Sequence, residues 1–248
     1  MDKIALITGG SRGIGAATAL LAAQRGYRVC INYYKNTDAA FRVVDTIQQN
    51  GGKAIALQAD ISKENEVVGL FEQLDKDLGR LTALVNNAGI LETQSRVEGI
   101  TSDRLLRIFN HNVVGSFICA REAIKRMSIK HGGAGGAIVN VSSVAARTGS
   151  PNEYVDYAAS KGAIDSFTVG LAKELAGEGI RVNAVRPGFI YTDIHASGGE
   201  PHRVDRLKAI IPLKRGGTSE EIANAILWLL SDEASFTTGA FIDITGGI

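Results

Sequence analysis

The sequence predicts an α/β protein: a single doubly wound domain of about seven mostly parallel strands with helices on both faces. Three observations lead to this prediction. Short apolar runs alternate with longer helical patterns along the whole chain, which is typical of a parallel sheet. The first run, Ile4–Ile7, ends in a glycine-rich turn that passes into an alanine- and leucine-rich helical pattern. No Pro- or Ser-rich linker divides the chain, so we expect one domain over residues 1–248.

The elements after the first helix follow from apolar runs and the glycines that separate them. The first helix is expected to end at Gly26, because glycine suits the left-handed conformation at a helix C-terminus. A buried strand over 28–33, a helix over 37–50 and a strand over 53–58 come next, and Gly51 stops that helix.

The middle of the chain carries two further helical patterns. Ser62 is expected to cap the first of them, because a serine hydroxyl suits an N-cap. Its apolar residues recur every three or four positions and so form one stripe: Val67, Phe71, Leu74 and Leu78. A strand over 81–86 follows, and a long helical pattern covers about 103–130.

The second half of the chain continues the alternation. Strands are expected over 137–142, 180–185 and 240–244, and helices over about 155–178 and from a cap at Thr218 or Ser219. Ligands of such sheets lie beyond the carboxyl ends of the strands, so the candidate site residues are those just after each strand.

Composition and charge exclude several classes of function. The net charge is +1, with 27 basic and 26 acidic side chains, so nothing in the charge balance favours nucleic acid or a membrane surface. No apolar stretch approaches the length of a membrane span. The start Met1-Asp-Lys leads directly into the first strand and indicates no signal peptide, which favours a cytoplasmic protein. The two cysteines are expected to be free thiols, and the four histidines show no metal-ligand spacing, so we expect no metal.

The glycine-rich turn after the first strand has the composition of a phosphate site. Its glycines let the backbone turn tightly and approach a ligand, and the helix behind it points free N–H groups at the turn. Strand, turn and helix in this order are typical of a Rossmann-type pyrophosphate site. The spacing Gly9-x-x-x-Gly13-x-Gly15 departs from the usual fingerprint, so an ordinary tight turn is the alternative. The expected cofactor contacts here are Gly9, Ser11, Arg12, Gly13, Ile14 and Gly15.

The end of the second strand indicates which dinucleotide is bound. An NAD site is expected to carry an acid about 20 residues past the glycines, for the ribose 2′-hydroxyl. Residues 16–37 contain no acid, whereas Arg12 and Lys35 would attract a 2′-phosphate. The sequence therefore favours NADP, with Asn32, Tyr33 and Lys35 at the cofactor, although Arg12 and Lys35 could instead be solvated surface charges.

Tyr157 and Lys161 lie four residues apart on a predicted helix and therefore face the same way. A phenol with a pKa of about 10 is a poor acid or base near neutral pH. A neighbouring ammonium, helped by the positive ring of an oxidised nicotinamide, would lower that pKa. Taken alone, the pair is better explained as a half-buried aromatic beside a solvated lysine.

Several motifs occur together in one order. They are Thr8-Gly-x-x-x-Gly-x-Gly15, Asn86-Asn-Ala-Gly89, a serine after the fifth strand, Tyr157-x-x-x-Lys161 and Pro187-Gly188. In this conjunction the chain resembles the short-chain dehydrogenase/reductase family over essentially its whole length. It looks most like the bacterial NADP-dependent members similar to 3-oxoacyl-carrier-protein reductase and glucose dehydrogenase.

The resemblance implies roles for individual residues. Tyr157 would be the general acid/base, Lys161 would bind the nicotinamide ribose, and Asn112 would hold a proton-relay water. Asp60 would contact the adenine ring, and Asn86, Ala88 and Gly89 would line the adenosine and ribose side. The nicotinamide carboxamide would be met by Pro187, Gly188, Ile190 and Thr192.

The resemblance leaves the catalytic serine open between Ser142 and Ser143, of which Ser143 is favoured. Its distance from Tyr157 is one residue longer than is common in the family, and an extra residue in the loop 149–155 would absorb this. Residues 193–212 resemble a mobile substrate lid.

The expected function is NADP(H)-dependent hydride transfer between the nicotinamide and a small carbonyl or alcohol substrate. The resemblance also implies a homotetramer, or otherwise a dimer. The alternative function is a non-catalytic NADP-binding sensor or scaffold, against which the complete set Asn112, Ser143, Tyr157 and Lys161 argues.

Overall fold

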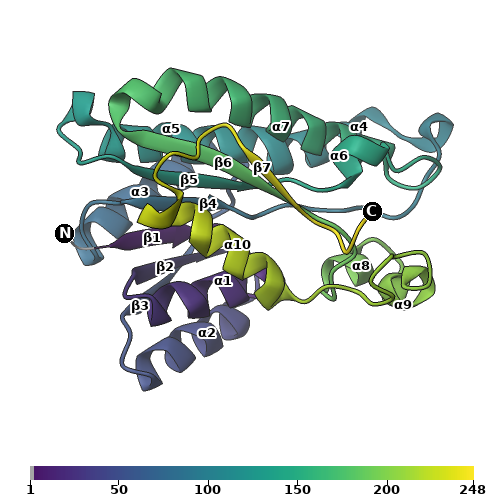
Figure 1. The fold of residues 1–248 in the computed structure, drawn as a ribbon, viewed down its shortest axis with the longest axis horizontal. Coiled ribbons are helices and arrows are strands. Elements are labelled where there is room, and N and C mark those ends of the chain that lie inside the picture. Colours follow the sequence, from purple (N-terminus) through teal and green to yellow (C-terminus); the bar gives the residue numbers. More distant parts are fainter. Residues whose placement is uncertain (1–2) are drawn as a thin grey trace.

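The computed structural model describes residues 3–248. Within them, seven strands form one sheet in the order β3-β2-β1-β4-β5-β6-β7, and every neighbouring pair is parallel (Figure 1). This confirms the predicted doubly wound α/β fold. The expected lack of a signal peptide rests in part on Met1 and Asp2, which lie outside the described residues.

The strands are short, and the five inner ones are largely buried, as their apolar sequences predict, whereas the edge strands β3 and β7 are partly exposed. Their bounds are Ile4–Ile7 (β1), Arg28–Tyr33 (β2), Ala54–Gln58 (β3), Ala83–Asn86 (β4), Gly136–Val141 (β5), Ile180–Pro187 (β6) and Phe241–Ile244 (β7). Ala5 of β1 pairs with Val29 of β2 on one side and with Ala83 of β4 on the other. The strand order therefore reverses at β1, and a crevice is expected at the carboxyl end of such a reversal.

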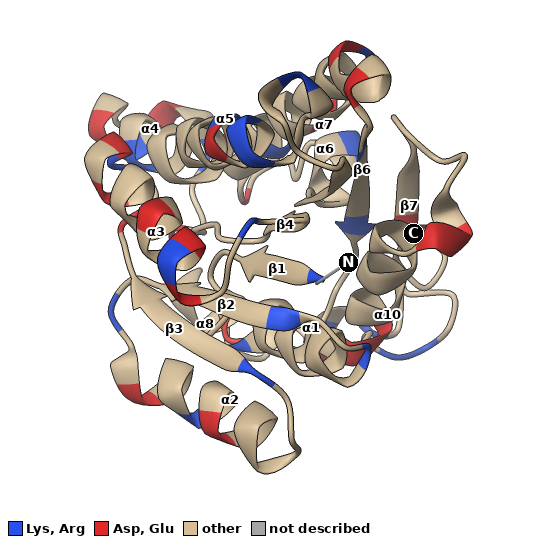
Figure 2. Cartoon of the chain, turned by 90° about the vertical axis from the view of Figure 1, so that its left-hand side faces the viewer, with Lys and Arg blue, Asp and Glu red and all other residues tan. Residues whose placement is uncertain are grey.

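Two layers of helices cover the sheet (Figure 1). One layer consists of α1 (Gly13–Gln24), α2 (Thr37–Gln49) and α10 (Ser219–Leu230), which share a buried apolar cluster with the β-sheet. The other consists of α3 (Glu64–Asp77), α5 (Gly115–Met127) and α7 (Val155–Leu175), which form a second cluster on the opposite face. Acidic and basic residues are intermixed along several of the helices (Figure 2).

The long helix expected over 103–130 is interrupted. The chain instead forms α4 (Ser102–Phe109), a π-helical turn (Asn110–Val114) and α5. The apolar pattern could not show this, because a π turn continues the helix without a Gly or Pro signal. The interruption contains Asn112, one of the predicted site residues.

The expected cap at Ser62 is also wrong. Helix α3 begins one residue later than that cap implies, with Lys63 at the N-cap position. The Ser62 hydroxyl and N–H instead donate to the Asp60 carboxylate, at 2.7 and 3.0 Å, which is the local turn that such side chains compete to form. The cap of α10 is Thr218, which forms a capping box with Glu221.

Shorter helices complete the described chain. They are α6 (Ala145–Thr148), which the sequence did not indicate, α8 (Ile194–Ser197) and α9 (Arg203–Leu207), which lie in the expected lid, and four 3₁₀ turns over Val97–Gly99, Ile129–His131, Ala176–Glu178 and Asp232–Ala234. Over residues 3–248, no helix has the length and apolar character needed to cross a membrane. The same residues contain no cluster of three or more His, Cys, Asp or Glu side chains that could hold a metal ion.

Candidate active site

A cavity of about 950 Å³ opens at the carboxyl ends of the strands, beside the glycine-rich turn and the start of α7. Most of the predicted site residues line it: Gly9, Ser11, Arg12, Gly13, Ile14, Asn32, Tyr33, Lys35, Asp60, Ala88, Gly89, Ser143, Tyr157, Lys161, Pro187, Gly188, Ile190 and Thr192. Gly15, Asn86 and Asn112 lie behind this lining. One cavity therefore collects residues that the sequence distributes over the whole chain.

The turn after β1 needs glycine for two separate reasons. Gly9 and Gly13 adopt left-handed backbone conformations, with φ of 61° and 53°, which side chains rarely adopt. At Gly15, a Cβ atom would lie 2.5 Å from the carbonyl oxygen of Gly9. No side chain caps the first N–H groups of α1, which begins directly after Arg12, so the helix can offer them to an anion.

Asn87 braces this turn, although sequence reasoning did not single it out. Its side-chain amide donates to the carbonyl oxygens of Thr8 and Gly9, at 2.8 and 3.2 Å. The Thr8 hydroxyl in turn accepts from the backbone N–H groups of Asn87 and Ala88, both at 3.0 Å. The motif Asn86-Asn-Ala-Gly89 is the signal that could have indicated it. Asn86 itself faces the interior, where its amide donates to Asn140 and to the Ser116 carbonyl.

The end of β2 and the end of β3 meet at the other end of the cavity. Asn32 donates to the Ala59 carbonyl at 3.0 Å and accepts from the Gly9 N–H at 3.4 Å, so it ties the glycine turn to the neighbouring loop. Burial acts to raise the pKa of Asp60, but hydrogen bonds from Ser62 outweigh it and the pKa is lowered. Lys35 and Arg12 both line the cavity here, as the sequence analysis expects of groups that would meet a 2′-phosphate.

Tyr157 and Lys161 lie one turn apart in α7 and both line the cavity. The Lys161 ammonium donates to the Val141 carbonyl at 2.7 Å and lies 5.6 Å from the centre of the Tyr157 ring. Burial raises the pKa of Tyr157 to about 12, against a lowering contribution from the Ser143 hydroxyl. The expected low phenol pKa is therefore not a property of the chain by itself. Burial also lowers the pKa of Lys161 to about 8, while the Asp165 carboxylate acts to raise it.

The two adjacent serines after β5 have different surroundings. Ser142 is buried, and its hydroxyl donates to Asp165 at 2.7 Å and to the Lys161 carbonyl at 3.2 Å. The Ser143 hydroxyl accepts from the Ala145 N–H at 3.1 Å and acts to lower the pKa of the Tyr157 phenol. Of the two serines, only Ser143 acts on the pKa of this phenol.

Asn112 reaches the site from the π-helical turn. Its amide oxygen accepts from the Ile90 N–H at 2.8 Å, and its nitrogen donates to the Ile90 carbonyl and to the Ser160 hydroxyl, both at 3.1 Å. A Cβ atom on Gly89 would lie 3.4 Å from the Asn112 amide oxygen and 3.5 Å from the Lys161 nitrogen. Asn112 and Lys161 therefore flank Gly89 just behind the cavity wall.

The segment after β6 forms the wall opposite the glycine turn. A Cβ atom on Gly13 would lie 3.2 Å from the Thr192 methyl group, so the two segments approach closely. Gly188 packs on Thr245, where a Cβ atom would lie 2.8 Å from the Thr245 Cα atom. Ile190 is buried and contributes apolar surface to this wall.

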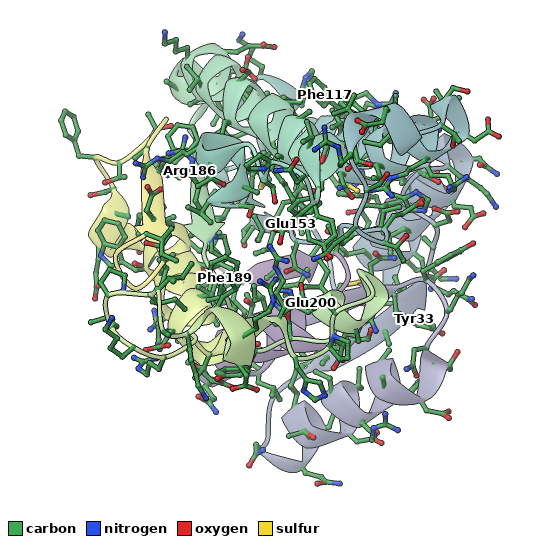
Figure 3. The ribbon with its side chains drawn as sticks, turned by 90° about the vertical axis from the view of Figure 1, so that its right-hand side faces the viewer. Tyr33, Phe117, Glu153, Arg186, Phe189 and Glu200 are labelled. Carbon is green, nitrogen blue, oxygen red and sulfur yellow. The ribbon has the colours of Figure 1, made fainter. Side chains whose placement is uncertain are left out.

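The expected lid, residues 193–212, is tied to the residues before α7 through Arg203. This buried side chain pairs with Glu153 and with Glu200, the latter at 2.8 Å, and lies over the rings of Tyr154 and Phe189. Figure 3 shows Glu153, Phe189 and Glu200 near one another around this point. These contacts lie far apart in the sequence, so sequence reasoning could not find them.

The other two lid cations are paired as well. Arg206 forms ion pairs with Glu200 and Glu153, and Lys208 pairs with Asp205 at 3.2 Å. The Arg and Lys side chains of the lid are therefore already paired with carboxylates of the same chain.

Comparison with known proteins identifies the family. A family model described as enoyl-(acyl carrier protein) reductase matches residues 9–248. The chain belongs to the short-chain dehydrogenase/reductase family. The relatives of this chain include 3-oxoacyl-[acyl-carrier-protein] reductases and a glucose 1-dehydrogenase, and the chain is an oxidoreductase of this family.

Similar proteins match this short-chain dehydrogenase/reductase along nearly their full length. The uncharacterized oxidoreductase YgfF of Escherichia coli is 65% identical over 98% of this chain and 99% of that protein. A 3-oxoacyl-[acyl-carrier-protein] reductase of Bos taurus is 42% identical over 100% and 98%. The crystal structure of a dehydrogenase/reductase from Sinorhizobium meliloti 1021 has a TM-score of 0.91 and 32% identity, and the match covers 99% of this chain and 94% of that one.

Proposed function

We propose that this oxidoreductase is NADP(H)-dependent and transfers a hydride between the nicotinamide and a carbonyl or alcohol substrate, with Tyr157 as general acid/base. One observation carries the proposal. Tyr157, Ser143 and Lys161 line the same cavity as the glycine turn. Cofactor and proton donor would therefore meet in one space, which hydride transfer coupled to proton transfer requires.

The residues present fit a dinucleotide. A Cβ atom at Gly15 would collide with the turn, and the uncapped start of α1 leaves N–H groups for a pyrophosphate. The pyrophosphate would be held by residues 9–15 and the adenosine by Asn32, Tyr33, Lys35, Asp60, Ala88 and Gly89, whereas Asn86 faces the interior and would support this wall from behind. The nicotinamide end would be held by Tyr157, Lys161, Pro187, Gly188, Ile190 and Thr192.

The bound nicotinamide would supply or accept the hydride, and the residues of the chain would transfer the proton and position the substrate. In the reduction direction, the raised pKa of Tyr157 keeps the phenol protonated at neutral pH, so it can donate to the carbonyl oxygen. Ser143 would hydrogen-bond the same oxygen. Lys161 would bind the ribose and favour the phenolate that remains after donation. Asn112 lies behind Gly89 beside the lysine, where it would order a water that returns the proton.

Arg12 and Lys35 support NADP as the cofactor, because both line the cavity and no carboxylate follows β2 directly. Replacing both by alanine is expected to reduce kcat/KM for NADPH about tenfold or more while leaving kcat/KM for NADH nearly unchanged. Equal losses with the two cofactors would contradict the assignment of these side chains to a 2′-phosphate.

The remaining expectations extend this proposal. Residues 1–248 would form a single catalytic domain, with 193–212 as the substrate lid. The substrate would be a small molecule, the location cytoplasmic and the assembly a homotetramer or a dimer. The free, buried Cys30 and Cys119 support a reducing compartment.

Tyr157→Phe tests the function directly. We expect NADPH to bind as before and turnover on a panel of ketones, aldehydes and quinones to be lost, measured by NADPH absorbance. Tyr191→Phe is the matched control, because Tyr191 is a half-exposed tyrosine just before the lid whose hydroxyl contacts Asp205. Full activity of Tyr157→Phe would refute the proposal, and NADPH binding without turnover by the native chain across the panel would favour a sensor or scaffold.

A further inference from the structure

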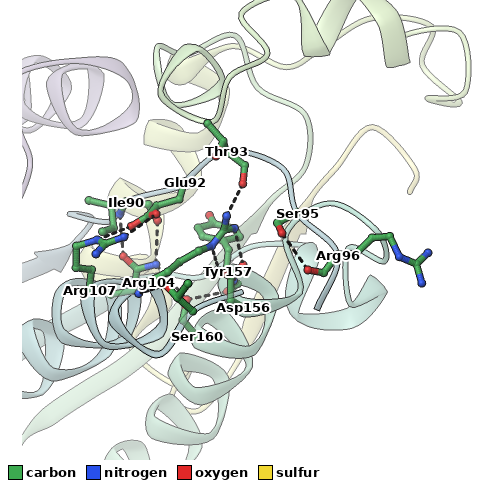
Figure 4. A network of polar contacts seen from close by, with 12 residues as sticks. Ile90, Glu92, Thr93, Ser95, Arg96, Arg104, Arg107, Asp156, Tyr157 and Ser160 are labelled. Atoms are coloured by element: carbon green, nitrogen blue, oxygen red, sulfur yellow. Dashed lines mark hydrogen bonds and ion pairs between the residues drawn. The ribbon is translucent and has the colours of Figure 1, made fainter. Parts of the chain in front are cut away.

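A buried ion pair lies next to Tyr157 and belongs to none of the roles assigned above. Arg104 of α4 donates to both carboxylate oxygens of Asp156 in the first turn of α7, at 2.5 and 3.2 Å (Figure 4). The residues are only 7% and 2% exposed, although 52 positions separate them in the sequence. This bidentate contact fixes the relative orientation of the two side chains as well as their distance, because two N–H donors of the planar guanidinium are engaged.

Asp156 passes this constraint to the Tyr157 backbone. The same carboxylate accepts from the Tyr157 N–H at 2.9 Å. This bond substitutes for an N-cap, because Tyr154 at the cap position of α7 provides no side-chain hydrogen bond. An acidic group in a first turn is also favoured by the helix dipole. The carbonyl of Tyr157 accepts from the Ser160 hydroxyl at 2.7 Å, so both backbone polar groups of Tyr157 are held by side chains.

The guanidinium also reaches the segment that borders the cavity after β4. Its third contact is a donation to the Thr93 carbonyl at 2.6 Å. That segment is held from the other side by Asn112, which binds Ile90 and also donates to Ser160. Arg104, Asp156, Ser160 and Asn112 therefore form a closed set of contacts around the Tyr157 backbone, as Figure 4 displays for most of its members.

We propose that Arg104 is a positioning residue for the reaction, which acts through Asp156 to hold Tyr157 in register with Ser143 and the cofactor. The proposal rests on the function proposed for Tyr157. A buried ion pair adds little net stability compared with apolar residues of the same size, so stability alone does not explain why Arg104 and Asp156 are paired here. Displacing a reacting group by about 1 Å can lower the reaction rate about 100-fold, so the need to place Tyr157 accurately does explain the pair.

The chain contains a matched control for Arg104. Arg107 lies one turn further along α4 and makes the same two-pronged contact with Glu92 in the same segment, at 2.8 and 3.1 Å. Its side chain is 54% exposed and that of Glu92 is 25% exposed. An exposed pair of this kind contributes little, and it does not contact α7 in the way that Arg104 does.

The test compares Arg104→Lys with Arg107→Lys, and both with the double variant Arg104→Met/Asp156→Asn. Lysine keeps the charge but not the bidentate contact, so Arg104→Lys is expected to lose about tenfold or more in kcat with KM for NADPH within about twofold. Arg107→Lys is expected to stay within about twofold of the native kcat. The double variant leaves no unpaired buried charge and is expected to keep a native melting temperature while its kcat stays about tenfold or more below native.

Each outcome decides the proposal. A folded Arg104→Lys protein with the kcat of Arg107→Lys would overturn it, as would a double variant with native kcat, because either result leaves Arg104 a structural residue only. Tyr157→Phe assayed alongside separates this proposal from the proposed function. Activity in Tyr157→Phe refutes that function, whereas an inactive Tyr157→Phe with a native-like Arg104→Lys refutes only the role of Arg104.

Discussion

The buried ammonium of Lys161 is expected to make stability depend on pH in a way that one substitution removes. Burial lowers its pKa from 10.5 to about 8, so the folded chain binds this proton less tightly than the unfolded chain does. Between those two values the unfolded state holds the extra proton, and stability therefore rises with pH and is lost as pH falls towards 8. The full effect corresponds to about 3 kcal/mol.

Lys161→Met removes this dependence. Urea unfolding of both proteins at about pH 7 and about pH 9.5 is expected to show the native chain gaining about 2 kcal/mol relative to the variant. Loss of the bond to the Val141 carbonyl shifts the variant equally at both pH values, so it cancels from this comparison. A difference between the two proteins that does not change with pH would refute the assignment of a depressed pKa to Lys161.

Two further pairs of substitutions separate residues that look alike in the sequence. Gly15→Ala is expected to abolish NADPH binding, measured by fluorescence titration, because its Cβ atom would lie 2.5 Å from the Gly9 carbonyl oxygen. Gly162→Ala meets no atom within 4 Å in the middle of α7 and should instead gain up to about 1 kcal/mol in urea unfolding. Ser143→Ala is expected to reduce kcat about 10- to 100-fold, since Ser143 lines the cavity with Tyr157 and acts to lower the pKa of its phenol. Ser142→Ala should instead cost about 1 to 2 kcal/mol of stability through the lost bond to Asp165, and the reverse pattern would exchange the two roles.

The fold was predictable because several signals agree in every part of the chain. Each strand is a short apolar run, and each strand before β7 is followed by turn residues and a helical pattern, as in Val67, Phe71 and Leu74 of α3. The ends of elements were less well predicted. Ser62 has the chemistry of a cap, yet its hydroxyl is taken by Asp60, and no sequence rule ranks these two local bonds.

The candidate site was predictable only where residues near in sequence act together. Tyr157 and Lys161 share a helix face, and the glycines form one turn, so spacing alone relates them. Contacts between distant segments have no such signal. Asn87 braces Thr8 from 79 positions away, and Arg203 of the lid pairs with Glu153 from 50 positions away. The sequence offers the chemistry of these side chains but not their partners.

The interrupted helix over residues 102–127 shows why the apolar period of 3.6 residues did not predict the π turn beside the site. Arg104 and Asn112 both contact α7, at Asp156 and at Ser160, which are one turn apart on a single helix face. Eight residues along a regular α-helix would leave those two side chains about 80° apart around the axis, so they could not both face α7 squarely. The π turn between them adds a residue to the turn and winds back much of that angle. The apolar residues here keep a period of 3.6 and therefore predict an unbroken helix. The interruption serves the two polar contacts that flank Tyr157, from Arg104 to Asp156 and from Asn112 to Ser160.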